Sequence, residues 1–151
     1  MNWKLPVLGA VLFVASTLAD DSTGRAKVIG EWQRLQSGAG KDSGEAWILT
    51  GRENGIHIVQ LQNGQKLAEF DCNTMGRECE TKDSGRQAKV SFWFNGPKLV
   101  ELETRGSEVV KRRFSVGDQG DVMEVEVIPI VPNGKPEVLQ FKRVQVSAAR
   151  K

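Results

Sequence analysis

The feature that most constrains the fold is a run of five strand-like segments between residues 88 and 146. Each segment is rich in Val, Phe, Leu or Ile, and a short polar turn separates it from the next. The segments are residues 88–94, 98–104, 108–116, 121–131 and 137–146. Short apolar runs separated by Asn-Gly or Asp/Gly clusters are typical of antiparallel hairpins. This half of the chain therefore predicts consecutive antiparallel strands.

The preceding part of the chain adds four further strand candidates, at residues 28–35, 45–50, 56–62 and 65–71. Asn63-Gly64 forms a two-residue hairpin turn between the last two. Residues 36–44 are rich in Gly and Ser, and residues 72–86 are mostly polar, so both predict mobile loops. No window sustains the apolar spacing of a long helix. The sequence therefore predicts an all-β domain.

The connections between the predicted strands decide the architecture. Nearly all of them are short, which favours sequential up-and-down pairing. An open sheet of this size would expose two edge strands, and closure into a barrel removes those edges. We therefore expect an antiparallel up-and-down barrel of about 8–10 strands. A two-sheet β-sandwich is the alternative.

The first nineteen residues have the features of a secretory signal peptide. Lys4 supplies a positive start, residues 5–14 are apolar, and small residues precede a cleavage point near Ala19. The apolar run is shorter than the roughly 20 residues of a membrane span. We therefore expect a secreted or periplasmic protein. Its predicted parts are a signal peptide (1–19), a flexible N-terminal segment (20–27), one barrel domain (28–146) and a tail (147–151).

Cys72 and Cys79 are the chain's two cysteines. In an exported protein, such a close pair is most simply a disulfide. Closing a loop of this length stabilises the fold by about 2.5 kcal/mol in the chain-entropy model. A redox pair or a pair of metal ligands are the alternatives, although redox pairs are more typical as Cys-x-x-Cys at a helix start.

The charge distribution excludes two classes of partner. The formal net charge is +2, and residues of both signs are interspersed along the chain. A nucleic-acid-binding protein would show a basic face, so we expect no nucleic-acid partner. An anionic membrane surface is excluded for the same reason.

Alternation along the strands predicts which side chains face the core. Val100 and Leu102 are predicted to face inward, with Glu101 and Glu103 on the solvent side. In the later strands the predicted inward residues are Val110, Phe114, Val116, Met123, Val125, Val127, Leu139 and Phe141. Arg112 and Arg143 fall on these apolar faces, where an arginine is rarely left without a partner.

Gly30-x-Trp32 in the first strand and Arg143 in the last resemble the lipocalin-like (calycin) barrels. The resemblance implies that Trp32 packs across the closed end of the barrel and that Arg143 lies over its ring. Such a cation–π contact is worth about 0.5–2 kcal/mol. The chain has no tyrosine, so the Thr-Asp-Tyr motif of that superfamily is absent. The strand ending in Phe141-Lys142-Arg143 also resembles small secreted bacterial β-domains of unassigned function, a resemblance that implies no activity.

No group of residues predicts an active site. His57 is the chain's single histidine and has the setting of an ordinary strand residue, without a nucleophile beside it. The pairs Glu101/Glu103 and Glu124/Glu126 are predicted to face solvent, which argues against a glycosidase pair. One histidine and a cysteine pair do not make a zinc site. We therefore predict no enzymatic activity, no metal and no cofactor.

Two functions are compatible with these observations. The first is an exported barrel that binds a small hydrophobic or fatty-acid-like ligand in its interior, since barrels of about eight strands can hold one small ligand. Arg112 or Arg143 would then meet the acidic head, and the other candidate contacts are Trp93, Phe114 and Phe141. The second is a structural or protein-interaction domain without a ligand. In that case the two arginines would stack on Trp32 or Trp93, or would face water if the register is shifted by one residue.

Overall fold

The computed structural model describes residues 21–36 and 43–145, which form one short helix and ten strands. The elements are α1 (Asp21–Ala26), β1 (Gly30–Arg34), β2 (Glu45–Arg52), β3 (Gly55–Gln62), β4 (Gln65–Asn73), β5 (Met75–Asp83), β6 (Arg86–Asn95), β7 (Lys98–Arg105), β8 (Glu108–Val116), β9 (Val122–Val131) and β10 (Glu137–Arg143). The predicted signal peptide (1–19), the tail (147–151) and residues 37–42 of the predicted first loop lie outside the described residues.

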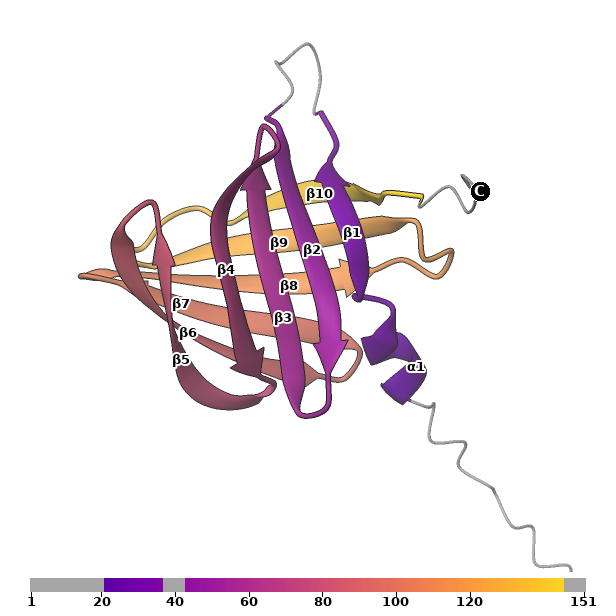
Figure 1. Cartoon of the computed structure of the whole chain (residues 1–151), viewed down its shortest axis with the longest axis horizontal. Helices are drawn as coiled ribbons and strands as arrows, with labels where there is room; N and C mark the ends of the chain where they lie inside the picture. The colour runs from indigo at the N-terminus through magenta and orange to yellow at the C-terminus, as the bar shows by residue number, and fades with distance from the viewer. Residues whose placement is uncertain (1–20, 37–42, 146–151) are drawn as a thin grey trace, which may run out of the picture.

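All ten strands belong to one antiparallel sheet with the order β4-β3-β2-β1-β10-β9-β8-β7-β6-β5. Two meanders, β1–β4 and β5–β10, are joined where β1 pairs with β10. The sheet curls into a nearly closed barrel (Figure 1). The prediction of an up-and-down antiparallel barrel is confirmed, and the sandwich alternative does not apply.

The two ends of the strand order, β4 and β5, meet at a junction that we call the seam. These strands are consecutive in the chain but are not neighbours in the hydrogen-bonded order. A disulfide between Cys72 on β4 and Cys79 on β5 crosses the seam, with 5.7 Å between the Cα atoms. The predicted disulfide is therefore present, and it completes the circle covalently where the described strands form no ladder.

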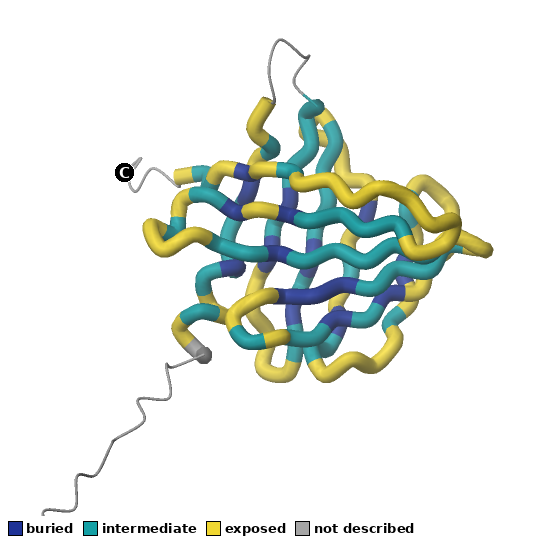
Figure 2. The backbone as a smooth tube through the Cα atoms, turned by 180° about the vertical axis from the view of Figure 1, so that it is seen from behind, coloured by how far each residue is buried: buried dark blue, intermediate teal, exposed yellow. Residues whose placement is uncertain are grey.

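Large apolar side chains from nearly every strand fill the barrel. Trp32, Phe92, Phe114 and Phe141 are fully buried. Trp47 and Phe114 pack edge to face, and their ring centroids lie 5.4 Å apart. Figure 2 shows the buried positions within the strands and the exposed positions mostly at the turns. This packing follows the inward alternation that the sequence predicts for β8, β9 and β10.

Strand β5 corrects the prediction of a mobile loop over residues 72–86. Its sequence, MGRECETKD, contains no valine, isoleucine or aromatic residue, so local propensity gives no strand signal. Its pairing with β6 and the disulfide to β4 hold it in place. Tertiary contacts outweigh local propensity at this strand.

Helix α1 occupies most of the segment for which the sequence predicts a loose chain. Arg25 holds the helix against the β6–β7 turn, since its Nε donates a hydrogen bond of 3.1 Å to the Gly96 carbonyl. The Arg25 guanidinium also lies 5.1 Å from the centre of the Phe94 ring. In the described part of the chain, no helix has the length and hydropathy needed to cross a membrane.

The prediction of which β7 side chains face the interior is wrong. Leu99 and Glu101 pair with Phe114 and Arg112 of β8, so these residues share the interior face. Glu101 is 0% exposed, whereas Val100 lies on the opposite face. The prediction assumed that apolar residues point inward, which fails here because the interior contains charged residues and the outer face is partly apolar.

Candidate functional site

Arg143 packs on the Trp32 ring where β1 pairs with β10. The Arg143 guanidinium carbon lies 4.2 Å from the centre of the Trp32 ring. Its nitrogens donate hydrogen bonds of 2.7, 2.6 and 2.6 Å to the carbonyls of Ile29, Lys27 and Gly120. Backbone carbonyls therefore engage every nitrogen of this guanidinium. The side chain therefore joins the start of β1 to β10 and to the loop before β9.

Gly30 makes room for this contact. Its φ is 147°, and a Cβ added there would lie 2.3 Å from Arg143 Nη1. No side chain fits at that distance, so glycine is required by the arginine packed against it. The Gly30-x-Trp32 sequence thus provides both the gap for Arg143 and the ring beneath it.

The predicted ligand contacts do not converge on one cavity. Phe114 and Phe141 are 0% exposed members of the packed core. Trp93 pairs with Val100 and Met75 on the outer side of the sheet. Arg143 is held by the backbone as described above. Arg112 is the predicted contact that lines a cavity in the described part of the barrel.

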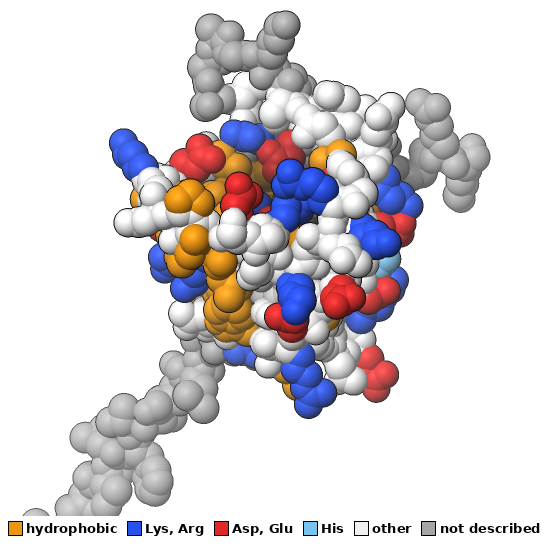
Figure 3. Space-filling view, turned by 90° about the vertical axis from the view of Figure 1, so that its left-hand side faces the viewer, with side chains coloured by type: hydrophobic (Ala, Val, Ile, Leu, Met, Phe, Trp, Pro, Cys, Tyr) orange, Lys and Arg blue, Asp and Glu red, His pale blue; other side chains and the backbone are white. Residues whose placement is uncertain are grey.

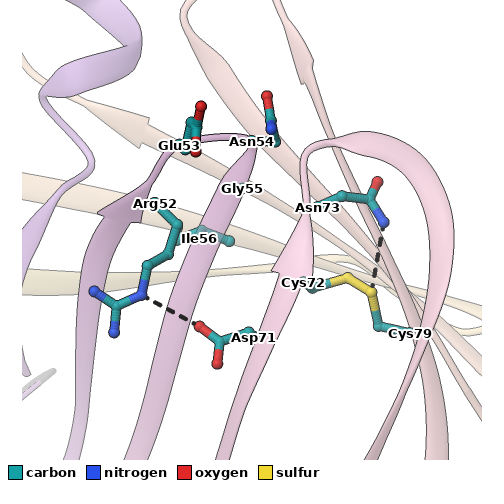
Figure 4. Close-up of a pocket in the computed structure, with 9 residues that line it drawn as sticks. All are labelled: Arg52, Glu53, Asn54, Gly55, Ile56, Asp71, Cys72, Asn73 and Cys79. Carbon is teal, nitrogen blue, oxygen red and sulfur yellow. Dashed lines mark hydrogen bonds and ion pairs between the residues drawn. A yellow bond between two sulfur atoms is a disulfide. The ribbon is translucent and has the colours of Figure 1, made fainter.

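A larger pocket of about 540 Å³ lies beside the seam, and we call it the disulfide pocket (Figure 4). Its apolar base consists of Ile56 and the cystine formed by Cys72 and Cys79. Ile56 and Cys72 are buried members of the core cluster. The remaining lining residues are Arg52, Glu53, Asn54, Gly55, Asp71 and Asn73. Pockets that bind small molecules typically measure roughly 300–1,000 Å³.

A second hollow of about 340 Å³ shares Arg52–Ile56 with the disulfide pocket and extends toward α1. Ile29 and Phe94 line it, together with Met75, a residue that is 63% exposed. The two hollows therefore present apolar side chains next to each other around the β2–β3 turn.

Charged side chains surround the outer rim of the disulfide pocket. Arg52 Nε lies 3.4 Å from Asp71 Oδ1 (Figure 4). His57 stands between two carboxylates, 3.0 Å from Asp71 and 3.2 Å from Glu69. Hydrogen bonding from Lys66 and then from His57 lowers the pKa of Glu69, and hydrogen bonding from His57 lowers the pKa of Asp71. Arg52, Glu53 and Asp71 line the pocket and make a polar rim over its apolar base, whereas His57 and Glu69 lie beside Asp71 outside the lining.

Seven charged side chains form a second group, which we call the interior cluster. Arg112 Nη1 lies 3.4 Å from Glu101 and 3.7 Å from Glu103. Arg105 pairs with Glu103 at 3.4 Å and with Asp83 at 3.2 Å. Arg34 pairs with Glu45 at 3.0 Å, and the charge of Glu45 acts on Arg112 and helps to raise its pKa. The cluster consists of Arg34, Glu45, Asp83, Glu101, Glu103, Arg105 and Arg112.

Glu101 is the most deeply buried member of the interior cluster. Neither of its carboxylate oxygens has a hydrogen bond within the described residues, because the contact with Arg112 is an ion pair without hydrogen-bond geometry. Burial raises the pKa of Glu101, and the charge of Arg112 only partly opposes that effect. Burial alone would lower the pKa of Arg112, but the charges of Glu101 and Glu103 raise it.

The interior cluster borders a cavity of about 130 Å³, which we call the polar cavity. Its lining residues are Glu45, Trp47, Gln60, Leu61, Gln62, Leu67 and Arg112. It lies at the start of β2, whereas the disulfide pocket lies at the end of that strand. Figure 3 shows the molecule from the left of Figure 1, with hydrophobic side chains in a hollow that acidic and basic groups flank.

Sequence reasoning missed the interior cluster, although a signal for it exists. The turn at residues 105–107 fixes the register of the β7–β8 hairpin, and that register places Glu101 opposite Arg112. Combining the register with the inward position of Arg112 would have placed Glu101 inside. The disulfide pocket has no comparable signal, because its lining comes from four strands, β2 to β5, and from the β2–β3 turn.

Ten antiparallel strands form a nearly closed barrel with an arginine over the first-strand tryptophan, which is the architecture that the resemblance to lipocalin-like (calycin) barrels implies. Solved structures of this kind are similar to the chain. A secretory abundant heat soluble protein from Ramazzottius varieornatus has a TM-score of 0.66 at 12% identity, over 78% of this chain and 96% of that one. A Schistosoma mansoni fatty acid binding protein, in complex with arachidonic acid, has a TM-score of 0.62 at 17% identity, over 81% and 99%.

The fluorescent protein UnaG is also similar, with a TM-score of 0.55 at 15% identity over 78% of this chain and 98% of that one. A comparison of the sequence with protein families finds no match, and a comparison with curated proteins finds none either. At these identities the likeness establishes the fold.

Proposed function

We propose that this protein is an exported, non-enzymatic barrel that binds a small hydrophobic molecule in the disulfide pocket. The observation that carries the proposal is the pocket of about 540 Å³ with Ile56 and the Cys72–Cys79 cystine as its apolar base. An apolar ligand placed there would remove its own apolar surface from water, which is favourable by about 25 cal/mol per Å². Fatty acid binding by a barrel of the same fold supports the same reading.

The polar rim fits an amphipathic ligand. Arg52 carries a positive charge at the mouth, and its partner Asp71 is itself exposed. A ligand with an acidic head could exchange places with Asp71 on Arg52 while its apolar part contacts Ile56. This arrangement assigns the head-group role to Arg52, instead of the Arg112 or Arg143 of the sequence analysis.

Methyl NMR of isoleucine-labelled protein tests the proposal. Nile red, an uncharged hydrophobic dye, is titrated into the full chain while the δ1-methyl resonances are followed. We expect saturable one-to-one shifts at Ile29 and Ile56, which line the two adjoining hollows. Ile128 and Ile130 on β9 are controls within the same molecule, and we expect them to stay unchanged.

The same titration can contradict the proposal. Shifts that never saturate, or shifts at Ile130 without any at Ile56, would show that the dye adsorbs to the outer surface. Native mass spectrometry of protein purified without detergent adds a second readout. We expect a discrete mass adduct that disappears after denaturing extraction.

The export part of the proposal rests on the disulfide and on residues 1–19. Disulfides persist in oxidising compartments outside the cytosol, and two of the similar structures are described as secretory. We expect the intact mass of the purified protein to correspond to cleavage near Ala19 and to fall by two mass units for the disulfide. An uncleaved chain would contradict this part alone.

A protein-interaction role is the second candidate function. Ile130, Val131 and Val138 on β9 and β10 are 43%, 47% and 58% exposed. Apolar side chains on the outside of a sheet can contact a partner. If this surface binds a protein partner, Val138→Asp should abolish the binding of that partner, while Nile red should still bind at Ile56.

A further inference from the structure

We propose that the Cys72–Cys79 disulfide is a reducible site that controls ligand binding in the disulfide pocket: a dithiol opens the bond, and the reduced protein binds the hydrophobic ligand more weakly. This inference rests on the proposed function, because it concerns the ligand of the same pocket. Three features of the structure carry it: the place of the cystine in the pocket wall, the loop that the cystine closes, and the unequal exposure of its two residues.

The cystine is part of the surface that the ligand would contact. Cys72 and Cys79 both line the pocket and form its base together with Ile56. Cys79 comes from β5, whereas the other lining residues come from β2, β3, β4 and the β2–β3 turn. The pocket therefore reaches across the seam through the disulfide itself. Breaking this bond uncouples one wall of the pocket from the others and replaces the S–S bond by two thiols.

The disulfide also closes a short loop that carries part of the second hollow. Met75 lies in this loop, lines the second hollow and pairs with Trp93 of β6. The register of β5 against β6 shifts between Met75 and Glu78, so the regular ladder is interrupted inside the loop. The Asn73 side chain supports the loop by accepting hydrogen bonds of 3.0 and 3.2 Å from the backbone N–H groups of Met75 and Arg77. Reduction should therefore loosen a wall of both hollows.

The unequal exposure of the two cysteines sets the course of the exchange. Cys79 is half-buried and Cys72 is 4% exposed, so we expect a thiolate to attack Cys79 Sγ. This attack forms a mixed disulfide, breaks the Cys72–Cys79 bond and releases Cys72 as a thiolate, which takes up a proton. The second thiolate of the dithiol then closes the disulfide of the reductant and releases Cys79. Asn73 Nδ2 donates a hydrogen bond of 3.7 Å to Cys79 Sγ, which favours this leaving thiolate (Figure 4).

Thermodynamic linkage gives the proposal two measurable sides. If reduction weakens ligand binding by some factor, the ligand must make the disulfide harder to reduce at equilibrium by the same factor. Coupling between two sites of a protein is typically about 5–150-fold. We therefore expect reduction to weaken binding about fivefold or more.

The first experiment repeats the Nile red titration at the Ile56 methyl resonance, on oxidised full chain and on full chain reduced with dithiothreitol. We expect saturable binding in both states, weaker by about fivefold or more after reduction. Cys72→Ser/Cys79→Ser should bind as weakly as the reduced protein and should not respond to dithiothreitol. Backbone amide spectra verify that every sample is folded.

Met123→Ala on β9 is the matched control for a loss of stability. Met123 is buried in the core and lines neither hollow, so this variant destabilises the barrel while the disulfide stays intact. We expect it to bind Nile red as tightly as the oxidised native chain does. An affinity loss as large as that of the double serine variant would show that weaker binding follows from lower stability alone, which overturns the inference.

The second experiment measures the reverse effect. The native chain is equilibrated with a fixed ratio of reduced to oxidised dithiothreitol, with and without saturating Nile red, and its thiols are alkylated and counted by mass. We expect the dye to raise the ratio of oxidised to reduced protein by the factor found in the titrations.

Equal affinities in the two redox states, or a dye that leaves the thiol–disulfide equilibrium unchanged, would overturn this inference and leave the proposed function intact. Tighter binding after reduction would overturn it as well. The absence of saturable shifts at Ile56 in both states would overturn the proposed function together with it. The failure of the switch is therefore distinguishable from the failure of the binding site.

Discussion

Arg143 joins three separate stretches of backbone through one guanidinium, which contacts Ile29, Lys27 and Gly120. The planar fork of an arginine suits this arrangement, because its donors are fixed in direction and its face can stack on a ring. Lysine has one ammonium and could not reach all three carbonyls while covering Trp32. One side chain thus makes the contacts at the junction of the two meanders that several smaller side chains would otherwise have to make.

Replacement of Arg143 should therefore destabilise the barrel strongly. We expect Arg143→Met to lower the free energy of unfolding by about 3 kcal/mol, from the lost carbonyl hydrogen bonds and the lost cation–π contact. Urea denaturation followed by far-UV circular dichroism measures the change. Lys142→Met, on the exposed neighbour in the same strand, is the control and should cost well under 1 kcal/mol. Equal midpoints for the two variants would contradict the role of Arg143.

Glu101 makes a prediction about pH. Its folded-state pKa is raised, first by burial, so the folded protein binds a proton more tightly than the unfolded chain does. Its contribution to stability is then fully present below the unfolded pKa of about 4.5 and is lost as the pH rises through the folded value. Glu101→Gln removes this titration. We expect the variant to gain stability relative to the native chain between pH 4 and pH 8.

Urea unfolding at pH 4, 6 and 8 provides the measurement for Glu101. Glu124→Gln, on the exposed side of β9, controls for the change from carboxylate to amide elsewhere in the sheet. A difference between Glu101→Gln and the native chain that stays constant with pH would contradict the raised pKa. A difference that moves against the variant at high pH would show that Arg112 stabilises the ionised carboxylate more than burial penalises it.

Among the elements, β4 and β5 depend most on the disulfide. They end the hydrogen-bonded order, so the Cys72–Cys79 bond supplies a covalent link where the described strands have no ladder. We expect the double variant Cys72→Ser/Cys79→Ser to lose about 2.5 kcal/mol of stability. Amide exchange should rise in β4 and β5 while β8 and β9 stay protected. An increase spread evenly over the sheet would contradict this account of the seam.

The strands differ in how far the sequence predicts them. β3, β4 and β8 combine clear turns with apolar alternation, so their positions follow from local rules. β5 could not be predicted, because its place depends on β6 and on a disulfide instead of its own residues. The prediction of which β7 side chains face the interior was wrong for a different reason. Its charged residue Glu101 is stabilised inside by Arg112, a pairing that hydrophobicity alone does not show.

At the scale of the whole molecule, the disulfide pocket and the polar cavity lie at the two ends of β2 and have different linings. Between them lies a core in which Trp32, Phe92 and Phe114 are fully buried. The sequence predicts the barrel because closure follows from strand count and short turns. It does not predict these two hollows, because each is lined by residues from several strands that are brought together only in the closed sheet.

The joining of the two meanders also bears on how quickly the chain can fold. Every other ladder connects strands that follow one another in sequence, whereas the hydrogen bond from Arg143 to Ile29 spans 114 residues. Contacts between distant segments form slowly, because the intervening chain must be ordered before the contact stabilises it. The hairpins can therefore form early, but β1 and β10 meet last. Until then the β1 and β10 edges are unpaired and can associate with other chains, so the pairing of these two strands removes one source of aggregation during folding.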